Sequence, residues 1–123
     1  MRIAMVLSAS LLALSATAAV AAPAKMGDTA MGKAWVDHKG MALYTFDKDE
    51  AGQSNCYDKC ATNWPPLMAK AGDKAEGEWT IVSRTDGTKM WAYEGHPLYL
   101  WIKDQKPGEV TGDGVGGVWH LAK

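Results

Sequence analysis

The sequence lacks several features that would point to a familiar class of function. It holds only two cysteines and one phenylalanine, and beyond its N-terminal segment it has no apolar run long enough to span a bilayer. Its formal net charge is −1, with 13 basic and 14 acidic side chains spread along the chain. That balance provides neither the clustered basic face that nucleic acid requires nor the polybasic patch that an anionic membrane requires. We therefore expect neither of them as a partner once the chain has been exported.

Signatures of enzyme chemistry are also missing. No serine lies in a nucleophile elbow, and no glycine-rich loop stands between a strand and a helix to hold a phosphate. The segment 112–117 is rich in glycine, but no strand is expected before it and no helix after it, so we interpret it as a loop. These absences favour a protein without enzymatic activity.

The N-terminal segment has the pattern of an export signal. Arg2 supplies a short positive start, an apolar stretch follows, and Ala19-Val20-Ala21 fits the small-x-small site of signal peptidase. We predict a signal peptide over 1–21 and a periplasmic or secreted protein. No cysteine lies near the cleavage site to carry a lipid. The segment 22–32 is small, polar and without periodicity, which predicts a disordered lead-in.

The rest of the chain, 33–123, has the size of one domain, since about 100 residues form a single core. Its pattern is that of short strands separated by turn signals, such as Thr85-Asp86-Gly87. Strands are expected at 33–38, 41–46, 79–83, 88–93, 97–102 and 118–122. Ser54 is expected to cap a short helical turn that runs through Cys60. The predicted fold is a small all-β domain of antiparallel sheets with one helical turn near the cysteines.

The chain also contains two diverged copies of one unit. When the sequence is shifted by 55 positions, six residues fall on related residues without a gap. The matched pairs are Gly40 and Gly95, Leu43 and Leu98, Tyr44 and Tyr99, Phe46 and Trp101, Asp49 and Asp104, and Trp64 and Trp119. We interpret them as a duplication, with repeats at about 35–67 and 90–122.

These repeated residues resemble a known family. The carriers are Leu43-Tyr44-Thr45-Phe46-Asp47-Lys48-Asp49, Cys56 with Cys60, Trp64-Pro65-Pro66-Leu67, Leu98-Tyr99-Leu100-Trp101 and Gly116-Gly117-Val118-Trp119-His120. They are similar to bacterial secreted proteins and predicted lipoproteins with a Tyr-x-aromatic-x-x-Asp motif, known as the secreted repeat of unknown function. The resemblance covers most of the chain after the predicted signal, and it implies no particular activity.

The repeated aromatic residues have two interpretations. On a strand, the first and third motif positions point to one face, so the rings can pack as a shared core, with Asp49 and Asp104 capping the turns that follow. Alternatively, the rings form an exposed platform that, with the loop 103–117, binds an envelope protein, a peptide or a glycan. The candidate binding residues are Tyr44, Phe46, Tyr99, Trp101 and Trp119.

The two cysteines, Cys56 and Cys60, are expected to form a disulfide, because the predicted destination is oxidising. A redox-active pair is the other reading, but Asp58 between the cysteines disfavours a thiolate.

The three histidines, His38, His96 and His120, give the rival hypothesis of a metal- or haem-associated redox accessory protein. Imidazole is a ligand of copper, zinc and haem iron, although no spacing in the sequence requires such a site. The sequence has no Cys-x-x-Cys-His for covalent haem. The main hypothesis remains a non-enzymatic binding or interaction module of the cell envelope.

Overall fold

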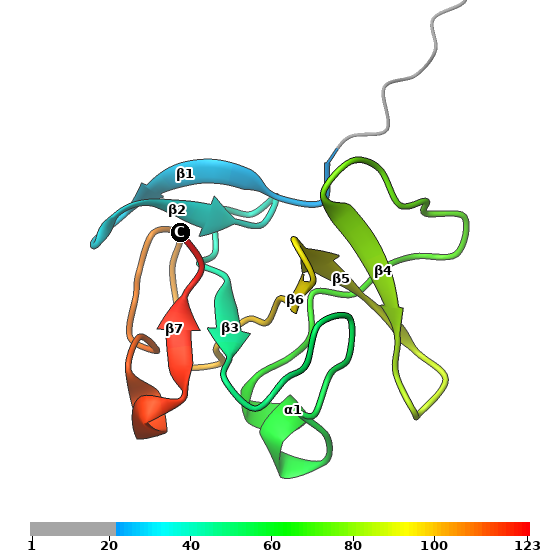
Figure 1. Ribbon diagram of the computed structural model, residues 1–123. Helices are drawn as coiled ribbons and strands as arrows, with labels where there is room; N and C mark the ends of the chain where they lie inside the picture. The colour runs from blue at the N-terminus through cyan, green and yellow to red at the C-terminus, as the bar shows by residue number, and fades with distance from the viewer. Residues whose placement is uncertain (1–21) are drawn as a thin grey trace, which may run out of the picture.

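The computed structural model of the protein describes residues 22–123, and the predicted signal peptide at 1–21 lies outside that range. Within the described range the chain forms short strands, one α-helix and one 3-10 turn (Figure 1). In chain order they are β1 (Lys25–Thr29), β2 (Gly32–Val36), β3 (Tyr44–Phe46), α1 (Lys59–Asn63), β4 (Trp79–Ser83), β5 (Lys89–Tyr93), β6 (His96–Pro97), η1 (Val115–Gly117) and β7 (Trp119–Leu121). None of the helices within 22–123 has the length and hydropathy of a membrane span.

The strands form three small antiparallel sheets, which confirms the all-β prediction. β1 pairs with β2, β3 with β7, and β5 lies between β4 and β6. The predicted hairpin turn joins β4 to β5, where Asp86 Oδ1 accepts hydrogen bonds from the backbone N–H (3.0 Å) and the hydroxyl (2.6 Å) of Thr88. Gly87 has a φ of 86°, a conformation that glycine adopts without strain. Local chemistry therefore explains this hairpin.

The expected disordered lead-in at 22–32 is wrong, because Lys25–Thr29 within it form β1. The strand is polar and mostly exposed, so it carries no apolar signal, and its order comes from backbone pairing with β2 from Lys25↔Val36 to Thr29↔Gly32. Ala24 is buried in the core at 4 % exposure. The first repeat therefore begins with a hairpin, as the second does with β4 and β5.

The two repeats meet at their tyrosines. Tyr44 N–H donates to the Tyr99 carbonyl (2.8 Å), and Tyr99 N–H donates to the Tyr44 carbonyl (2.9 Å). On either side, Leu67 N–H donates to the Leu98 carbonyl and Ala122 N–H to the Leu43 carbonyl, both at 2.9 Å. Since 67 and 122 differ by the same 55 positions as 43 and 98, these bonds are repeat-related. Each repeat thus ends by pairing with the other repeat.

Two buried clusters flank this junction. Tyr44 and Tyr99 belong to one cluster, whereas the preceding residues, Leu43 and Leu98, belong to the other. Successive side chains of an extended segment point to opposite sides. Each strand of the junction therefore supplies a tyrosine to one cluster and a leucine to the other. All four of these side chains are at most 1 % exposed.

The disulfide between Cys56 and Cys60 is present and lies beside α1, as predicted. Its Cα atoms are 5.2 Å apart, within the ordinary range for a disulfide. The expected capping role of Ser54 is wrong: the helix begins at Lys59, and Asp58 occupies the capping position without a side-chain bond. The Ser54 hydroxyl is instead bound to side chains of the core.

Candidate functional site

Two short polar contacts between side chains join the two motifs. The Tyr44 hydroxyl donates to Asp104 Oδ2, and the Tyr99 hydroxyl donates to Asp49 Oδ2, each at 2.6 Å. Both tyrosines are 0 % exposed. The length is typical of a hydroxyl bound to a carboxylate. Each motif therefore binds its tyrosine with the aspartate of the other copy.

The second oxygen of each aspartate holds the loop that follows it. Asp49 Oδ1 accepts from the backbone N–H of Asn55 at 2.7 Å. Asp104 Oδ1 accepts from the backbone N–H (2.8 Å) and the hydroxyl (2.6 Å) of Thr111. The structure thus places both aspartates at loop starts, where the sequence analysis expected turn-capping residues. The added contact to the partner tyrosine is one that sequence reasoning did not anticipate.

A buried arginine, Arg84, extends the hydrogen-bonded network of Tyr99 and Asp49, and sequence reasoning missed it. Arg84 donates from Nη1 to Ser54 Oγ (2.8 Å) and from Nη2 to the Cys56 carbonyl (2.7 Å). Ser54 Oγ also lies 2.6 Å from the Tyr99 hydroxyl. Since Tyr99 donates its proton to Asp49, Ser54 donates to Tyr99. Arg84 follows β4 in a hairpin sequence, so it resembled an ordinary exposed turn charge.

Burial determines the proton affinity of this network. It raises the pKa of both Tyr44 and Tyr99 far above the ordinary value, and the adjacent carboxylates raise it further. Burial also raises the pKa of Asp49, against the opposing effect of the hydrogen bonds from Tyr99 and Asn55. The tyrosines therefore remain protonated donors at neutral pH and act as fixed structural links.

Four aromatic rings form a continuous column beside the network. Trp64 and Trp119 stack at 3.8 Å between centroids with an interplanar angle of 4°. Phe46 stacks on Trp119 at 4.2 Å, and Trp101 stacks on Trp64 at 3.9 Å. The order is symmetric, because the inner rings are repeat equivalents and so are the outer ones. The column therefore also joins the two copies.

The column and the tyrosines decide which predicted binding residues a ligand can reach. Tyr44, Tyr99 and Trp119 are buried in the shared core. Phe46 and Trp101, the outer rings, are half-buried and pack against that cluster. Three of the five candidates thus occupy the core position that the sequence left open as an alternative. Only the two ends of the column remain accessible.

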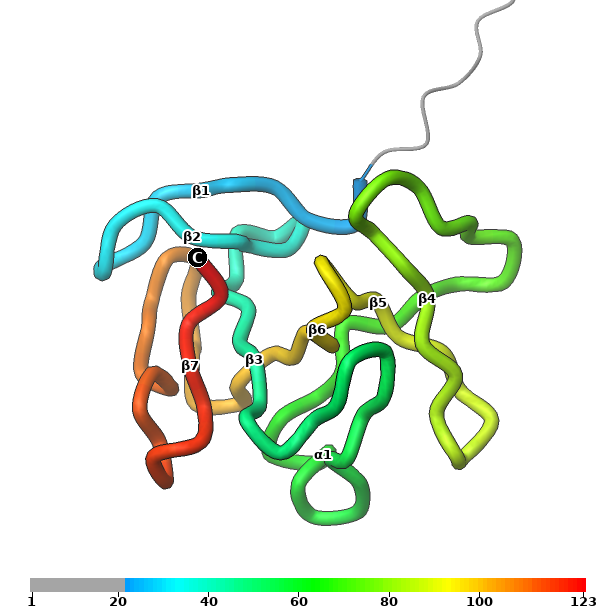
Figure 2. Tube along the Cα trace, in the orientation of Figure 1, coloured from blue at the N-terminus to red at the C-terminus, as the bar shows by residue number. Residues whose placement is uncertain are grey.

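The glycine-rich loop 103–117 lies alongside β7 (Figure 2). Its buried Gly112 donates from its N–H to the Tyr44 hydroxyl at 3.2 Å. A Cβ atom at Gly112 would lie 2.8 Å from Trp64 Cη2 and 2.9 Å from two ring atoms of Tyr44. The glycine is thus required by close packing of the loop on the core.

The three histidines lie in different settings. His120 Nε2 lies 2.8 Å from Asp47 Oδ2, and the side chains are 47 % and 53 % exposed, respectively. His38 and His96 line two separate hollows. Within residues 22–123, no three His, Cys, Asp or Glu side chains are grouped closely enough to hold a metal ion.

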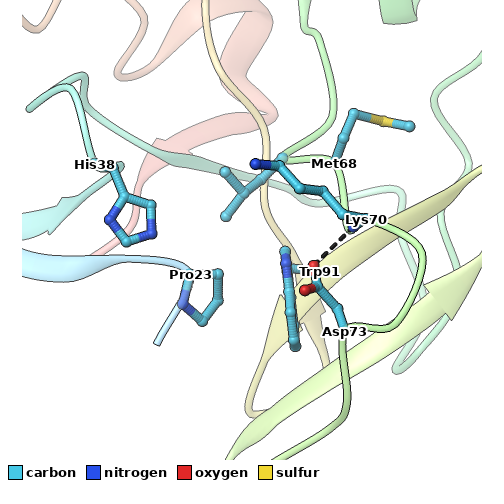
Figure 3. A pocket seen from close by; sticks show the side chains of 7 residues that line it. Pro23, His38, Met68, Lys70, Asp73 and Trp91 are labelled. Atoms are coloured by element: carbon cyan, nitrogen blue, oxygen red, sulfur yellow. Dashed lines mark hydrogen bonds between the residues drawn. The ribbon is translucent and has the colours of Figure 1, made fainter. Parts of the chain in front are cut away.

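The hollows with His38 and His96 share repeat-related lining at three positions, although the two histidines are not repeat equivalents. The first, of about 170 Å³, has His38, Pro23 and Trp91 around it (Figure 3). The second, of about 240 Å³, has His96 and Trp35. Leu67 and Met68 line the first, and the residues 55 positions later, Ala122 and Lys123, line the second. The duplicated frame therefore offers two diverged versions of one surface hollow.

The fold and the exchanged contacts define the class first: an all-β protein of two related units that share one core. A family model described as a secreted repeat of unknown function matches the chain twice, at residues 25–68 and 80–123. The chain belongs to this family, which confirms the resemblance expected from its sequence. Each match begins ahead of the predicted repeat, at 25 instead of 35 and at 80 instead of 90, since each unit includes its hairpin. Comparisons with curated proteins and with solved structures gave no match.

Proposed function

We propose that the protein is a binding or interaction module of the cell envelope, periplasmic or secreted, without catalytic chemistry of its own. The observation that carries the proposal is the pair of hydrogen bonds from Tyr44 to Asp104 and from Tyr99 to Asp49. These bonds join the two repeats, so the polar groups of the motif serve the fold. A rigid frame of this kind positions surface side chains at low entropic cost to binding.

The Trp101 end of the aromatic column is the surface that we assign to a partner. Trp101 is half-buried, its neighbour Ile102 is 50 % exposed, and Lys103 Nζ lies 5.6 Å from the centroid of the Trp101 ring. An apolar side chain between an aromatic ring and a cation suits an envelope protein, a peptide or a glycan. Phe46 offers the corresponding ring at the other end of the column.

A titration followed by tryptophan fluorescence and by the indole N–H signals in NMR tests this proposal. Envelope peptides and glycans are added to the wild-type chain, to Ile102→Ser and to Lys74→Ala, a control in the polar loop between the repeats. A partner that uses this surface shifts the Trp101 indole N–H signal. Ile102→Ser should weaken the binding of that partner, whereas Lys74→Ala should leave it unchanged. If no compound perturbs any tryptophan and the emission is already fully blue-shifted, the binding role is wrong.

The second candidate is a metal- or haem-associated redox accessory protein. The observation that favours it is the His120–Asp47 pair, because a carboxylate on one ring nitrogen orients imidazole for binding through the other. Calorimetric titration with copper, zinc and haem, with His120→Ala alongside, tests it. Micromolar binding that His120→Ala removes supports this candidate. No binding at micromolar concentration rejects it.

A further inference from the structure

The larger of the two repeat-related hollows has the features of a ligand site. It lies where several strands meet and has a volume of about 240 Å³. Trp35 of β2 and Tyr93 of β5 form its walls, and both rings are half-buried. Buried Leu98 and Leu121 supply apolar surface beneath them. Partly open rings over an apolar floor are typical of small-molecule sites.

A third ring holds the two wall rings in place. Trp35 and Tyr93 lie 4.7 Å apart between centroids and are tilted by 51°. Trp79, which is 9 % exposed, packs on both, at 5.2 Å from Trp35 and 4.8 Å from Tyr93. Because these rings are already ordered, a ligand that stacks on them pays little to immobilise them.

The rim of the hollow supplies polar groups of both kinds. Thr45, His96 and Lys123 line it and make no side-chain hydrogen bond or ion pair with any residue in 22–123. The hydroxyl of Thr45 can donate and accept, the imidazole of His96 offers a ring N–H, and the Lys123 side chain donates. Glu94 adds an acceptor, and its negative charge offsets the positive charge of Lys123. The rim therefore favours a neutral ligand with several hydroxyl or amide groups.

We propose that this hollow binds a neutral saccharide ring. A pyranose presents a flat C–H face that stacks on an aromatic ring, while its hydroxyls both donate and accept hydrogen bonds around the edge. The volume lies below the range of roughly 300–1,000 Å³ that drug-sized ligands occupy, so it suits one ring of a chain. The inference rests on the proposed binding function and adds a ligand class and a second surface to it. The related hollow is smaller, at about 170 Å³, and its Trp91 is only 5 % exposed, so it provides an internal comparison.

NMR titration of the full exported chain with N-acetylglucosamine and glucose oligosaccharides tests the inference. The indole N–H signal of Trp35 is expected to shift until the site is fully occupied. In a saturation-transfer experiment, irradiation of protein protons is expected to lower the signals of the sugar C–H protons. His96→Ala, which changes an exposed side chain, should weaken binding by about fivefold, since one hydrogen bond is lost. Trp35→Phe should weaken it further by shrinking the stacking face. His38→Ala, at an exposed histidine of the related hollow, is the control and should leave the affinity unchanged.

Each other outcome overturns the inference in a distinguishable way. If the saccharides leave the Trp35 signal in place while a peptide shifts Trp101, the saccharide site is wrong and the binding function stands. Equal weakening by His38→Ala and His96→Ala would mean that the sugars do not select this hollow. If neither sugars nor peptides shift any indole, the proposed function fails together with the inference.

Discussion

At the scale of single residues, each motif tyrosine donates to a carboxylate that its own repeat does not supply. Tyr44 and Asp104 are 60 positions apart, and Tyr99 and Asp49 are 50 apart. Removing one hydroxyl leaves a buried carboxylate oxygen without its donor, which costs more than the loss of a hydrogen bond between exposed groups. Each copy of the motif therefore supplies one tyrosine and one aspartate to hydrogen bonds that join the two repeats.

The exchange predicts which residue pairs are energetically coupled. Tyr44→Phe is expected to lower the free energy of unfolding by about 2–3 kcal/mol, measured by denaturant titration. The double-mutant cycle of Tyr44→Phe with Asp104→Asn should give a coupling energy of about 1 kcal/mol or more. The cycle of Tyr44→Phe with Asp49→Asn, within one motif, should give less than about 0.5 kcal/mol. Tyr93→Phe, at a half-buried tyrosine outside both motifs, serves as a control for loss of a hydroxyl. Stronger coupling within one motif than between motifs would contradict the exchange.

Alkaline pH should unfold the protein through the same two tyrosines. Their pKa values are raised by burial in the folded state, so the unfolded chain loses these protons first as the pH rises above about 10. The folded state then holds more protons than the unfolded state, and stability falls by up to about 1.4 kcal/mol per pH unit for each tyrosine. Below that pH both states keep the protons, and these groups contribute no pH dependence.

Denaturant titrations at pH 8 to 11 measure this slope. Tyr99→Phe removes one of the two protons and should make the decline shallower by about half, despite lowering stability at pH 8. Absorbance of tyrosinate should rise together with unfolding. If the free energy of unfolding were unchanged across this range, Tyr44 and Tyr99 would not have raised pKa values in the folded state, and the prediction would be wrong.

At the scale of elements, the loop 103–117 depends on one glycine. Gly112→Ala would place a Cβ 2.8 Å from Trp64 and 2.9 Å from Tyr44, whose rings are fixed by the column and the hydroxyl bond. We expect a loss of about 1–3 kcal/mol from overpacking, measured as a shift of the unfolding midpoint at constant slope. Gln105→Ala, at an exposed position of the same loop, is the control and should change stability by less than about 0.5 kcal/mol. Equal effects of the two substitutions would mean that the loop does not press on the core.

The elements also show how far the sequence could predict this molecule. β4 and its turn were predictable because Asp86 and Gly87 determine that hairpin locally. β1 was not, because its residues are polar and its order comes from β2. The disulfide followed from the cysteine count, but the role of Ser54 depends on Arg84, 30 positions away. Local patterns therefore gave the fold class and the repeat, whereas contacts between the repeats could not be read from either copy alone.

At the scale of the whole molecule, both buried clusters contain residues of both repeats. Their backbones pair at the tyrosines, their aspartates are exchanged, and their tryptophans stack in one column. A single repeat would leave its buried tyrosine without a carboxylate and expose one face of its central tryptophan. Neither half has a core of its own, so we expect neither to fold alone.

Cutting the chain between the repeats tests this expectation. A protease site inserted in the exposed segment 74–77 allows cleavage after folding, away from every exchanged contact. We expect the two halves to stay together in gel filtration at micromolar concentration. The stability of the cut protein should now depend on concentration, because the linker no longer supplies a high effective concentration. Each half, when separated in denaturant and returned alone to buffer, should give the spectrum of an unfolded chain, and mixing should restore the native one.

A cut protein that also carries Tyr44→Phe and Tyr99→Phe provides the matched comparison. It loses both exchanged bonds while the aromatic column is retained, so the halves should separate at concentrations where the cut wild type stays associated. Two halves that each refold alone, with dispersed indole N–H signals, would show two independent domains and would remove the basis for a shared core. Association that the double substitution does not weaken would assign the junction to the column alone. The expected result, assembly that depends on the tyrosines, would mean that the duplicated motif serves to join two copies of one unit.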